Sequence, residues 1–268
     1  MRLVLAAAAV ALSSACPNYS VIPDDDRREI ENHHLGALLF FKQSMYVGQF
    51  YDDDRYRLVH PRKFEELTYL QTIEGDAIPP PPAEGIIPAG TRVRVESIEW
   101  PTGDVVFRRP LYTPRYTTWI MLRVARERGP EVTVERDQKH ILLLPGGIED
   151  AETFDEWFDA SLTKDDPNPW LLSLPEDQQR AIATKKPVKG MHYEALCAAI
   201  GYPDRITRNV VDGVTVETGA WGSTTVTLKD DVVDDVSVTK AGAPAAAQPS
   251  SDAPPDAPPD APSAGASR

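Results

Sequence analysis

The spacing of apolar residues divides the middle of the chain into a β-rich block followed by helical segments. From residue 87 to residue 144, apolar and charged residues alternate over short runs that glycine and proline interrupt, as is typical of half-buried strands. Val93 and Val95 alternate with arginines, and the alternation shifts at Ser97, which predicts a β-bulge. Further strands are expected at residues 98–100, 105–108, 118–125, 131–136 and 140–144.

Helical spacing appears on both sides of this block. Apolar residues three or four positions apart predict helices at residues 30–41, 61–70 and 151–162. Ser173 and Glu176 fit a capping box that would begin a helix ending near residue 184. Residues 78–87 contain four consecutive prolines, which donate no ladder hydrogen bonds, so this segment is expected to be a loop.

The last ordered unit is expected to be a helix that packs on a small antiparallel sheet. Gly190 and Gly201 bracket an apolar stripe of helical spacing, and Gly201 can adopt the left-handed conformation that ends a helix. Three strands are expected at residues 214–218, 224–228 and 232–238, with a turn at 229–231 between the last two.

The two ends of the chain have unusual compositions. Residues 1–15 contain Arg2, an apolar run at 3–12 and then small residues, which is the order of a secretory signal peptide. A membrane span needs about 20 apolar residues, so this run is too short to be one. Residues 241–268 consist mainly of Ala, Pro, Ser and Asp and cannot bury a core, so we expect a disordered tail.

The segment Leu12-Ser13-Ser14-Ala15-Cys16 resembles the bacterial lipoprotein signal, in which small residues precede a cysteine that is acylated through its sulfur. The chain departs from that pattern at Ser13, where the family favours leucine. The resemblance implies cleavage before Cys16 and a lipid anchor, such as palmitate, on that cysteine. The alternative is ordinary cleavage near Ala15, which leaves a free thiol.

The second cysteine, Cys197, lies among alanine, leucine and isoleucine on an expected helix. A cysteine in that setting is usually a small core residue. If Cys16 is acylated, Cys197 has no partner and no disulfide is expected.

Residues 189–238 contain Gly190-Met191, then Ile200-Gly201-Tyr202-Pro203-Asp204 and then Trp221-Gly222. With these motifs the segment resembles the BamE (SmpA/OmlA) lipoprotein family, and the resemblance covers under a fifth of the chain. The chain departs from the family at His192, where a Ser or Thr cap is usual, and at Asp231, where Gly is usual. The resemblance implies an envelope lipoprotein with an αβ binding module. Separately, residues 87–95 resemble the entry strand of bacterial SH-three-like barrels.

Together these patterns predict an α+β protein whose N-terminal domain is β-rich, as a small barrel or sandwich with short helices. The expected divisions are a signal peptide at 1–15, a lipidated cysteine and tether at 16–28, the N-terminal domain at 29–148, a helical connector at 149–187, the BamE-like module of one helix and three antiparallel strands at 188–240, and the tail at 241–268. The net charge of −13 argues against nucleic acid or an anionic lipid surface as a partner, because both attract clustered Lys and Arg.

Candidate chemistry is sparse. The sequence has no nucleophile elbow, phosphate loop or dinucleotide fingerprint. His33 and His34 are adjacent and would point to different faces of a helix, which makes them a poor metal pair. Residues 52–54 are three aspartates without the spacing of a calcium loop. We therefore expect a non-enzymatic protein without a metal or cofactor.

The aromatic residues of the β-rich block allow two interpretations. Trp100, Tyr112, Tyr116 and Trp119 either fill the core or line a groove for a peptide or glycan. Trp100, Trp119 and Trp221 are the candidate partner-binding residues. The expected function is that of a lipid-anchored envelope protein that faces the periplasm or lies at the outer membrane. It would act through contacts with envelope proteins in envelope assembly or maintenance, and the alternative is a peptidoglycan- or cell-wall-binding module.

Overall fold

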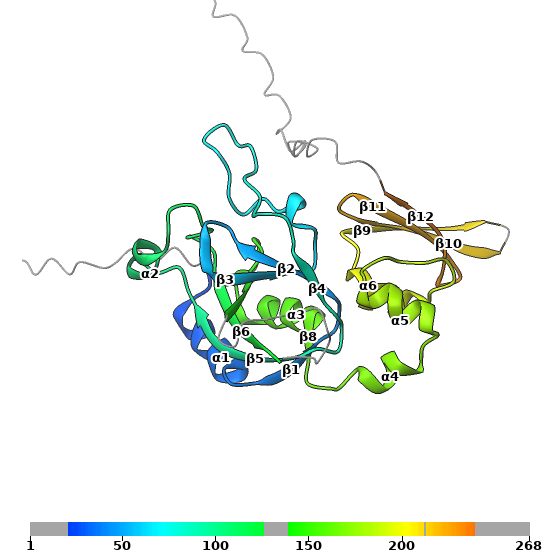
Figure 1. Cartoon of the computed structure of the whole chain (residues 1–268), viewed down its shortest axis with the longest axis horizontal. Coiled ribbons are helices and arrows are strands. Elements are labelled where there is room, and N and C mark those ends of the chain that lie inside the picture. Colours follow the sequence, from blue (N-terminus) through cyan, green and yellow to red (C-terminus); the bar gives the residue numbers. More distant parts are fainter. Residues whose placement is uncertain (1–20, 126–138, 212, 239–268) are drawn as a thin grey trace, which may run out of the picture.

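The computed structural model describes residues 21–125, 139–211 and 213–238, which form helices and two β-sheets (Figure 1). The α+β class expected from the sequence is confirmed. The expected signal peptide, Cys16, the expected strand at 131–136 and the tail from residue 241 lie outside the described residues.

The elements of the N-terminal part form one unit. Its helical elements are, in chain order, α1 (Asp24–His34), η1 (a 3-10 turn, Phe64–Glu66), α2 (Gly103–Arg108) and α3 (Ala151–Ser161). Its strands are β1 (Leu38–Phe41), β2 (Met45–Phe50), β3 (Asp53–His60), β4 (Gly85–Ile87), β5 (Arg92–Glu99), β6 (Trp119–Val124), β7 (Lys139–Leu143) and β8 (Leu162–Thr163).

The elements of the C-terminal part follow. Its helices are α4 (Asn168–Ser173), α5 (Glu176–Ala183) and α6 (Tyr193–Ile200). Its strands are β9 (Arg205–Val211), β10 (Val214–Trp221), β11 (Thr224–Lys229) and β12 (Val232–Val238).

Strands β1 to β8 form one sheet in the order β4-β2-β3-β7-β6-β5-β1-β8. Its neighbouring strands are antiparallel, except that β3 and β7 run parallel. Parallel neighbours need a long connection, and here that connection carries β4, β5, α2 and β6.

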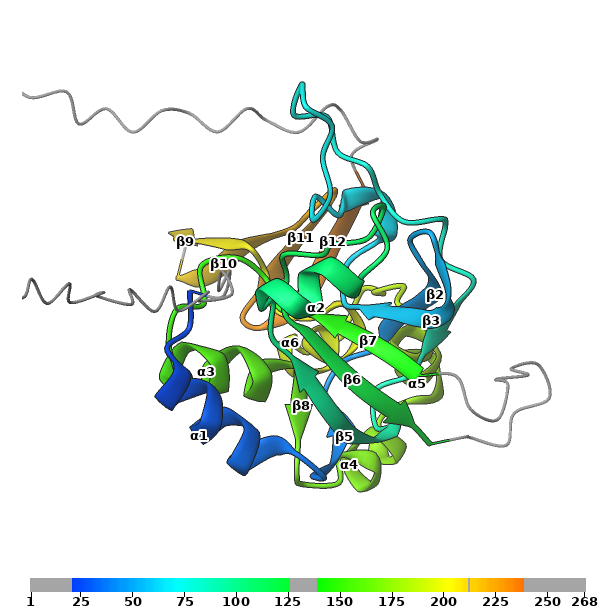
Figure 2. The ribbon, with the colours of Figure 1, turned by 90° about the vertical axis from the view of Figure 1, so that its left-hand side faces the viewer.

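The central strand β6 is buried on both faces, which explains its nearly continuous apolar sequence. Ile120 and Leu122 belong to the core beneath α1 and α3, to which Phe154 contributes. Trp119 and Met121 belong to a second core on the other side of the sheet, covered by the segment around η1. Figure 2 shows α1 and α3 side by side next to the sheet.

The helix expected over residues 30–41 is wrong beyond His34. Helix α1 begins earlier, within the segment 16–28 that we expected to be a tether. Gly36, with φ of +77°, follows this helix and turns the chain, because glycine adopts positive φ without a steric cost. The following apolar residues then alternate into the core from β1.

Two short elements also differ from expectation. Residues 61–70 contain the 3-10 turn η1 instead of an α-helix, and Phe64 in this turn is buried in the second core. Residues 105–108, expected as a strand, belong to α2, in which Val106 is buried and Phe107 is exposed. Runs this short do not show a period that separates helix from strand.

Three regular elements of the N-terminal part are confirmed. Strands β6 and β7 lie in the segments expected at 118–125 and 140–144, and α3 lies in the segment expected at 151–162. The loop expected over 78–87 is wrong at its end, where residues 85–87 form β4. The bulge expected at Ser97 appears as a register shift between Val95 and Ser97 where β5 pairs with β6.

The C-terminal module has four antiparallel strands, in the order β12-β11-β10-β9, where three were expected. Strands β10, β11 and β12 confirm the expected ones, and α6 confirms the helix, which stops at Gly201 with φ of +88°. Strand β9 escapes detection because all seven of its residues are exposed, so its sequence lacks an apolar–polar alternation.

Two local motifs of this part have different outcomes. Asp230 and Asp231 form the expected turn with φ of 46° and 63°, a conformation that aspartate tolerates better than most residues. The capping box is wrong, because Ser173 Oγ donates to Trp170 O within α4, and α5 begins at Glu176.

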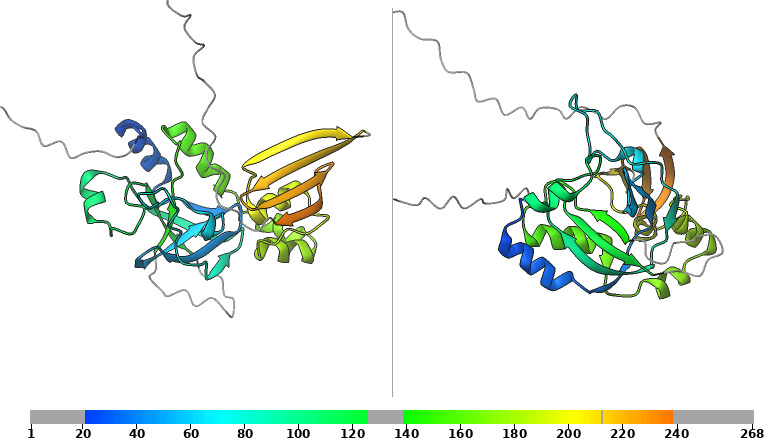
Figure 3. Two further views of the ribbon diagram at one scale, coloured as in Figure 1. Left: turned by 90° about the horizontal axis from the view of Figure 1, so that it is seen from above. Right: turned by 60° about the vertical axis from the view of Figure 1, so that its left-hand side comes forward.

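The two units meet at Ser44, which is fully buried between β1 and β2. Ser44 N–H donates to Ala198 O at 2.9 Å, and Ser44 Oγ donates to Ile182 O at 2.7 Å. These bonds hold α5 and α6 against the larger sheet. Figure 3 shows the same helices packed on one face of the four-stranded sheet.

Candidate functional site

A cavity of about 540 Å³ lies between the two units. One wall comes from the residues after β3, the end of β7 and the last turn of α3. The other comes from the residues after α5 and α6 and from the turn between β10 and β11. Pockets of roughly 300–1,000 Å³ hold small molecules or a few residues of a peptide, so the cavity has the size of a binding site.

Polar contacts between the units border this cavity. Arg62 forms an ion pair with Asp204 across the junction. Glu66 Oε1 accepts hydrogen bonds from Ser223 Oγ at 2.6 Å and Ser223 N–H at 3.2 Å. A Cβ at Gly222 would overlap the Glu66 carboxylate, and its φ of +54° also favours glycine at this position.

His60 lies in the cavity wall as a buried, neutral imidazole. Burial is the main cause that lowers its pKa to about 3, and the positive charge of Arg62 lowers it further. His60 Nδ1 accepts a hydrogen bond from Arg62 N–H at 3.0 Å, so the single ring proton lies on Nε2, which donates to Tyr69 Oη at 3.3 Å. Tyr69 Oη in turn donates to Leu143 O at 3.5 Å.

Lys185 is the buried cation of the site. Its Nζ donates to Ser44 O at 2.5 Å and to Ala199 O at 3.0 Å, and lies 5.1 Å from the centre of the Tyr46 ring. Burial lowers its pKa to about 7, because the ammonium loses hydration that two carbonyls replace only in part. The lysine therefore ties the two units together and places a titratable amine at the cavity.

Gln43 supplies an acceptor beside this amine. Its side chain is buried, and its Oε1 has no hydrogen-bond partner among the described residues. A Cβ at Gly201 would overlap this oxygen, so the glycine leaves room for the amide. A buried acceptor without a donor costs about 1–3 kcal/mol, and a ligand that donates to Gln43 would recover part of that cost.

The structure places the three candidate tryptophans in different surroundings. Trp221 lines the cavity, and its Nε1–H donates to Gly201 O at 2.7 Å. Trp100 is buried beside α1, where its Nε1–H donates to Glu31 Oε1 at 2.6 Å. Trp119 is buried in the second core. Of the three, Trp221 lines this cavity, while Trp100 and Trp119 have the surroundings of core residues.

Strand β9 extends from the mouth of the cavity. It begins directly after Asp204, which lines the cavity, and pairs with β10. In the described part of the chain, no strand pairs with the other side of β9. The sheet therefore presents a free edge of seven exposed residues next to the cavity.

His34, Asp53 and Cys197 have structural roles. His34 is buried and contacts Asp155 Oδ1 through Nε2 at 2.7 Å, whereas its neighbour His33 is exposed. Asp53 is buried and accepts hydrogen bonds from the Arg55 guanidinium at 2.7 and 2.8 Å. Cys197 is buried, and burial raises its pKa to about 11, which makes its thiol unreactive.

The described residues contain neither a group of metal ligands nor a membrane-spanning helix. Within 21–125, 139–211 and 213–238, no group of three or more His, Cys, Asp or Glu side chains could hold a metal ion. No helix in the same residues has the length and apolar character needed to cross a membrane.

Most residues of the cavity have no motif in the sequence that would predict a site. Lys185 and Lys186 are adjacent and would pass for surface residues, and Gln43 and His60 lie in segments without a recognisable motif. The β-branched residues Ile206, Val210 and Val211 are the one local signal for β9.

The chain matches no protein-family model, no curated protein sequence and no solved structure.

Proposed function

We propose that this protein is a non-enzymatic, lipid-anchored protein of the bacterial envelope that captures an extended segment of an envelope protein. The segment would add to the free edge of β9 and place one side chain in the cavity between the units. The observation that carries this proposal is the continuity of that free edge with the cavity mouth at Asp204.

The hydrogen-bond pattern of the four-stranded sheet indicates which backbone groups of β9 are available to a partner strand. Asp230 N–H donates to Thr215 O at 2.9 Å, so Thr215 and every second residue after it in β10 face β11. The residues between them bond to β9, through Thr207 and Asn209 among others. The backbone groups directed to the free edge are then those of Ile206, Arg208 and Val210.

Charge supports a neutral or acidic segment. Arg205 and Arg208 lie on β9, which has no carboxylate, and Arg208 pairs with Glu217 of β10. Two copies of β9 side by side would bring these arginines close to one another, which disfavours pairing of the strand with itself. A partner strand that carries Asp or Glu avoids this repulsion.

Val210→Pro is expected to abolish capture of the partner while leaving the module folded. The N–H of Val210 points to the free edge, so proline removes a donor from the binding edge without removing a bond to β10. A photo-crosslinking amino acid placed at the exposed Tyr202 reports capture in cells through adducts with envelope proteins. We expect at least a tenfold loss of the adduct, since several backbone bonds of about 1 kcal/mol each would be disturbed.

Val210→Thr is the matched control, because it keeps the N–H and the β-branched shape. It should preserve the adduct, and both variants should keep the circular dichroism of the wild type. An adduct that persists in Val210→Pro would show that the edge is not the binding surface.

The anchor is tested separately on Cys16. In the proposal, the mature wild-type chain recovered from membranes has the mass of residues 16–268 plus acyl chains, and Cys16→Ala abolishes both the acylation and the membrane association. Two or more acyl chains give stable anchoring at roughly 0.8 kcal/mol per buried CH₂. An unacylated wild-type mass would contradict the anchor and leave a thiol at position 16.

Peptidoglycan is the second candidate ligand, favoured by the aromatic residues and the free amide oxygen of the cavity. Tyr46, Tyr69, Trp157 and Trp221 line the cavity with Gln43, and aromatic rings with a hydrogen-bonding amide suit the apolar and hydroxyl faces of a sugar. Sedimentation with purified peptidoglycan that is lost in Gln43→Leu, but kept in Val210→Pro, would favour this function over peptide capture.

A further inference from the structure

A second surface, far from the cavity, presents apolar side chains to solvent. We define the α2 loop as residues 103–118, which comprise α2 and the segment that leads to β6. Phe107, Leu111, Tyr112 and Tyr116 are 81%, 71%, 64% and 61% exposed. Single exposed apolar residues are common, but four within ten positions of one loop mark an interaction surface.

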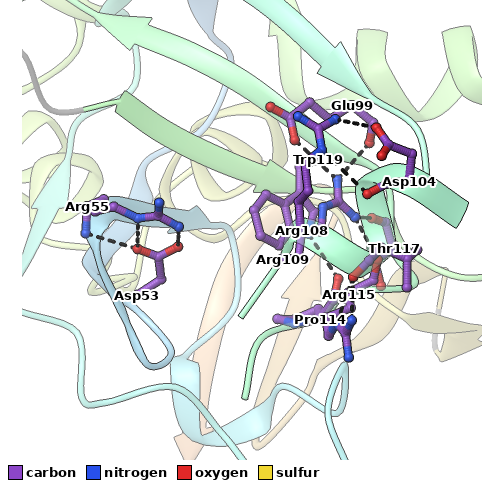
Figure 4. A network of polar contacts seen from close by, with 11 residues as sticks. Asp53, Arg55, Glu99, Asp104, Arg108, Arg109, Pro114, Arg115, Thr117 and Trp119 are labelled. Carbon is purple, nitrogen blue, oxygen red and sulfur yellow. Dashed lines mark hydrogen bonds and ion pairs between the residues drawn. The ribbon is translucent and has the colours of Figure 1, made fainter. Parts of the chain in front are cut away.

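The α2 loop is held in shape by a buried arginine (Figure 4). Arg109 Nη1 donates to Arg115 O and Thr117 O, each at 2.7 Å, and Nη2 donates to Glu99 O at 2.9 Å. Its guanidinium lies 3.8 Å from the centre of the Trp119 ring. One buried side chain thus ties the end of α2 to the last residues of the loop, to β5 through Glu99 and to β6 through the Trp119 ring.

Further bonds within the loop hold its turn. Arg115 Nε donates to Val106 O at 2.9 Å, Thr113 Oγ1 donates to Pro110 O at 2.8 Å, and Trp119 Nε1–H donates to Pro114 O at 2.9 Å. The exposed side chains therefore project from an ordered backbone, whereas a loop without such bonds could fold them inward. This arrangement keeps apolar groups in water, which is unfavourable unless another surface covers them.

The charge of the loop indicates what covers it. The loop has three arginines and one aspartate, so its net charge is +2 in a chain whose net charge is −13. Arg108 is exposed beside Phe107 and pairs with Asp104 at the surface, and no ion pair of Arg115 is found in the described residues. Exposed aromatic and leucine side chains next to arginine are the composition of an interfacial membrane contact, where the rings enter the headgroup region and the guanidinium groups meet lipid phosphates.

The position of the loop agrees with this partner. The described chain begins at residue 21, and Figures 1 and 3 place that end and α2 on the same side of the molecule, opposite the four-stranded sheet. Cys16 lies five positions before residue 21, a reach of at most about 17 Å. An acylated Cys16 would therefore hold this side of the protein close to the bilayer.

We propose that the α2 loop inserts Phe107, Leu111, Tyr112 and Tyr116 into the headgroup region of the membrane that carries the anchor. This inference rests on the proposed function, because it assumes the lipid anchor on Cys16 that brings the protein to its membrane. The contact would direct the four-stranded sheet with β9, on the opposite side, away from the lipid surface.

The test uses the mature full chain with an environment-sensitive nitrobenzoxadiazole label at one introduced cysteine. Phe107→Cys and Tyr112→Cys report on the α2 loop. Ile73→Cys is the control, since Ile73 is fully exposed between η1 and β4, in a segment that projects upward in Figure 1. Cys197 is buried and should not react, and labelling of the wild-type chain measures any free thiol at Cys16.

Each labelled protein is added to vesicles of phosphatidylcholine with a quarter of phosphatidylglycerol, and flotation measures binding independently of the label. We expect the emission at positions 107 and 112 to rise about twofold and shift to the blue as the label enters the interface, with no change at position 73. Protein that floats without a change at 107 and 112 would overturn the loop contact and leave the anchor intact.

The other outcomes are equally distinguishable. An equal rise at all three positions would overturn an oriented contact. A rise that requires added envelope proteins, and not lipid, would assign the surface to a protein partner and overturn the inference. Wild-type chain that carries no acyl groups by mass and still floats with a rise at 107 and 112 would support the loop contact and contradict the anchor. Wild-type chain that neither floats nor changes emission would contradict both.

Discussion

Between pH 6.5 and pH 4, His60 is expected to lower the free energy of unfolding of the wild-type chain by about 3 kcal/mol, and His60→Asn is expected to abolish this fall. The folded protein keeps His60 neutral, with a pKa of about 3 against an ordinary value of 6.5. Between these two values the unfolded chain binds the proton and the folded chain does not. The stabilisation is therefore complete above pH 6.5 and is lost progressively as the pH falls toward 3.

Asparagine suits this experiment because its side-chain oxygen can accept the Arg62 N–H that His60 Nδ1 accepts in the wild type. Urea unfolding across the pH range gives the free energy of unfolding of each variant. His33→Asn is the matched control, since that histidine is exposed, and its pH dependence should follow the wild type. A His60→Asn curve parallel to the wild type over this range would show that His60 is protonated in the folded chain.

Arg109→Leu is expected to lower the free energy of unfolding by about 3 kcal/mol, because it leaves three partly buried carbonyls without their donor. The guanidinium serves the carbonyls of Glu99, Arg115 and Thr117 and covers Trp119. Burial lowers the pKa of Arg109 to about 10, so the charge is held at some cost. Leucine removes that cost, but the loss of three bonds and of the ring contact outweighs it.

Arg108→Leu provides the comparison in the same helix. Arg108 is exposed and pairs with Asp104 one turn away, so its loss should change stability by no more than about 0.5 kcal/mol. Urea unfolding followed by tryptophan fluorescence measures both variants, because Trp119 lies directly beneath Arg109. A loss below 1 kcal/mol in Arg109→Leu would mean that water replaces the guanidinium at these carbonyls.

The destabilised arginine variant also bears on the membrane contact. Arg109 fixes the backbone from which Phe107 and Tyr112 project. The α2 loop and the junction between the two units therefore depend on different buried cations. Arg109 orders the α2 loop, whereas Lys185 joins the units around the cavity.

Secondary structure could be predicted from the sequence where a segment was long and its apolar residues recurred with a regular period. Strands β6 and β7 and helices α3 and α6 were predictable, because each buries a regular stripe of apolar side chains. The bulge at Ser97 was visible as a break in a two-residue period. Segment 30–41 misled, because Leu38 and Leu39 continue a helical spacing that Gly36 interrupts.

Residue types alone could not separate core from surface among the aromatic residues. Trp100 and Trp119 were candidates for partner binding and are buried, whereas Tyr112 and Tyr116 from the same segment are exposed. The difference depends on which face of the sheet and which side of a turn each residue occupies. That placement is set by strand pairing between β5 and β6 and by the hydrogen bonds of Arg109.

By itself, the sequence determined the α+β class, the regular strands and helices of the two cores, and the turn at Asp230 and Asp231. These features depend on side chains near one another in the chain, whose spacing records which face is buried. The tertiary structure alone decided the free edge of β9, the neutral state of His60 and the cavity beside Lys185. The cavity depends on residues more than 100 positions apart, such as Ser44 and Lys185, because burial and hydrogen bonding between two docked units leave no local pattern in either segment. The edge of β9 has no local signal because all seven of its residues are exposed.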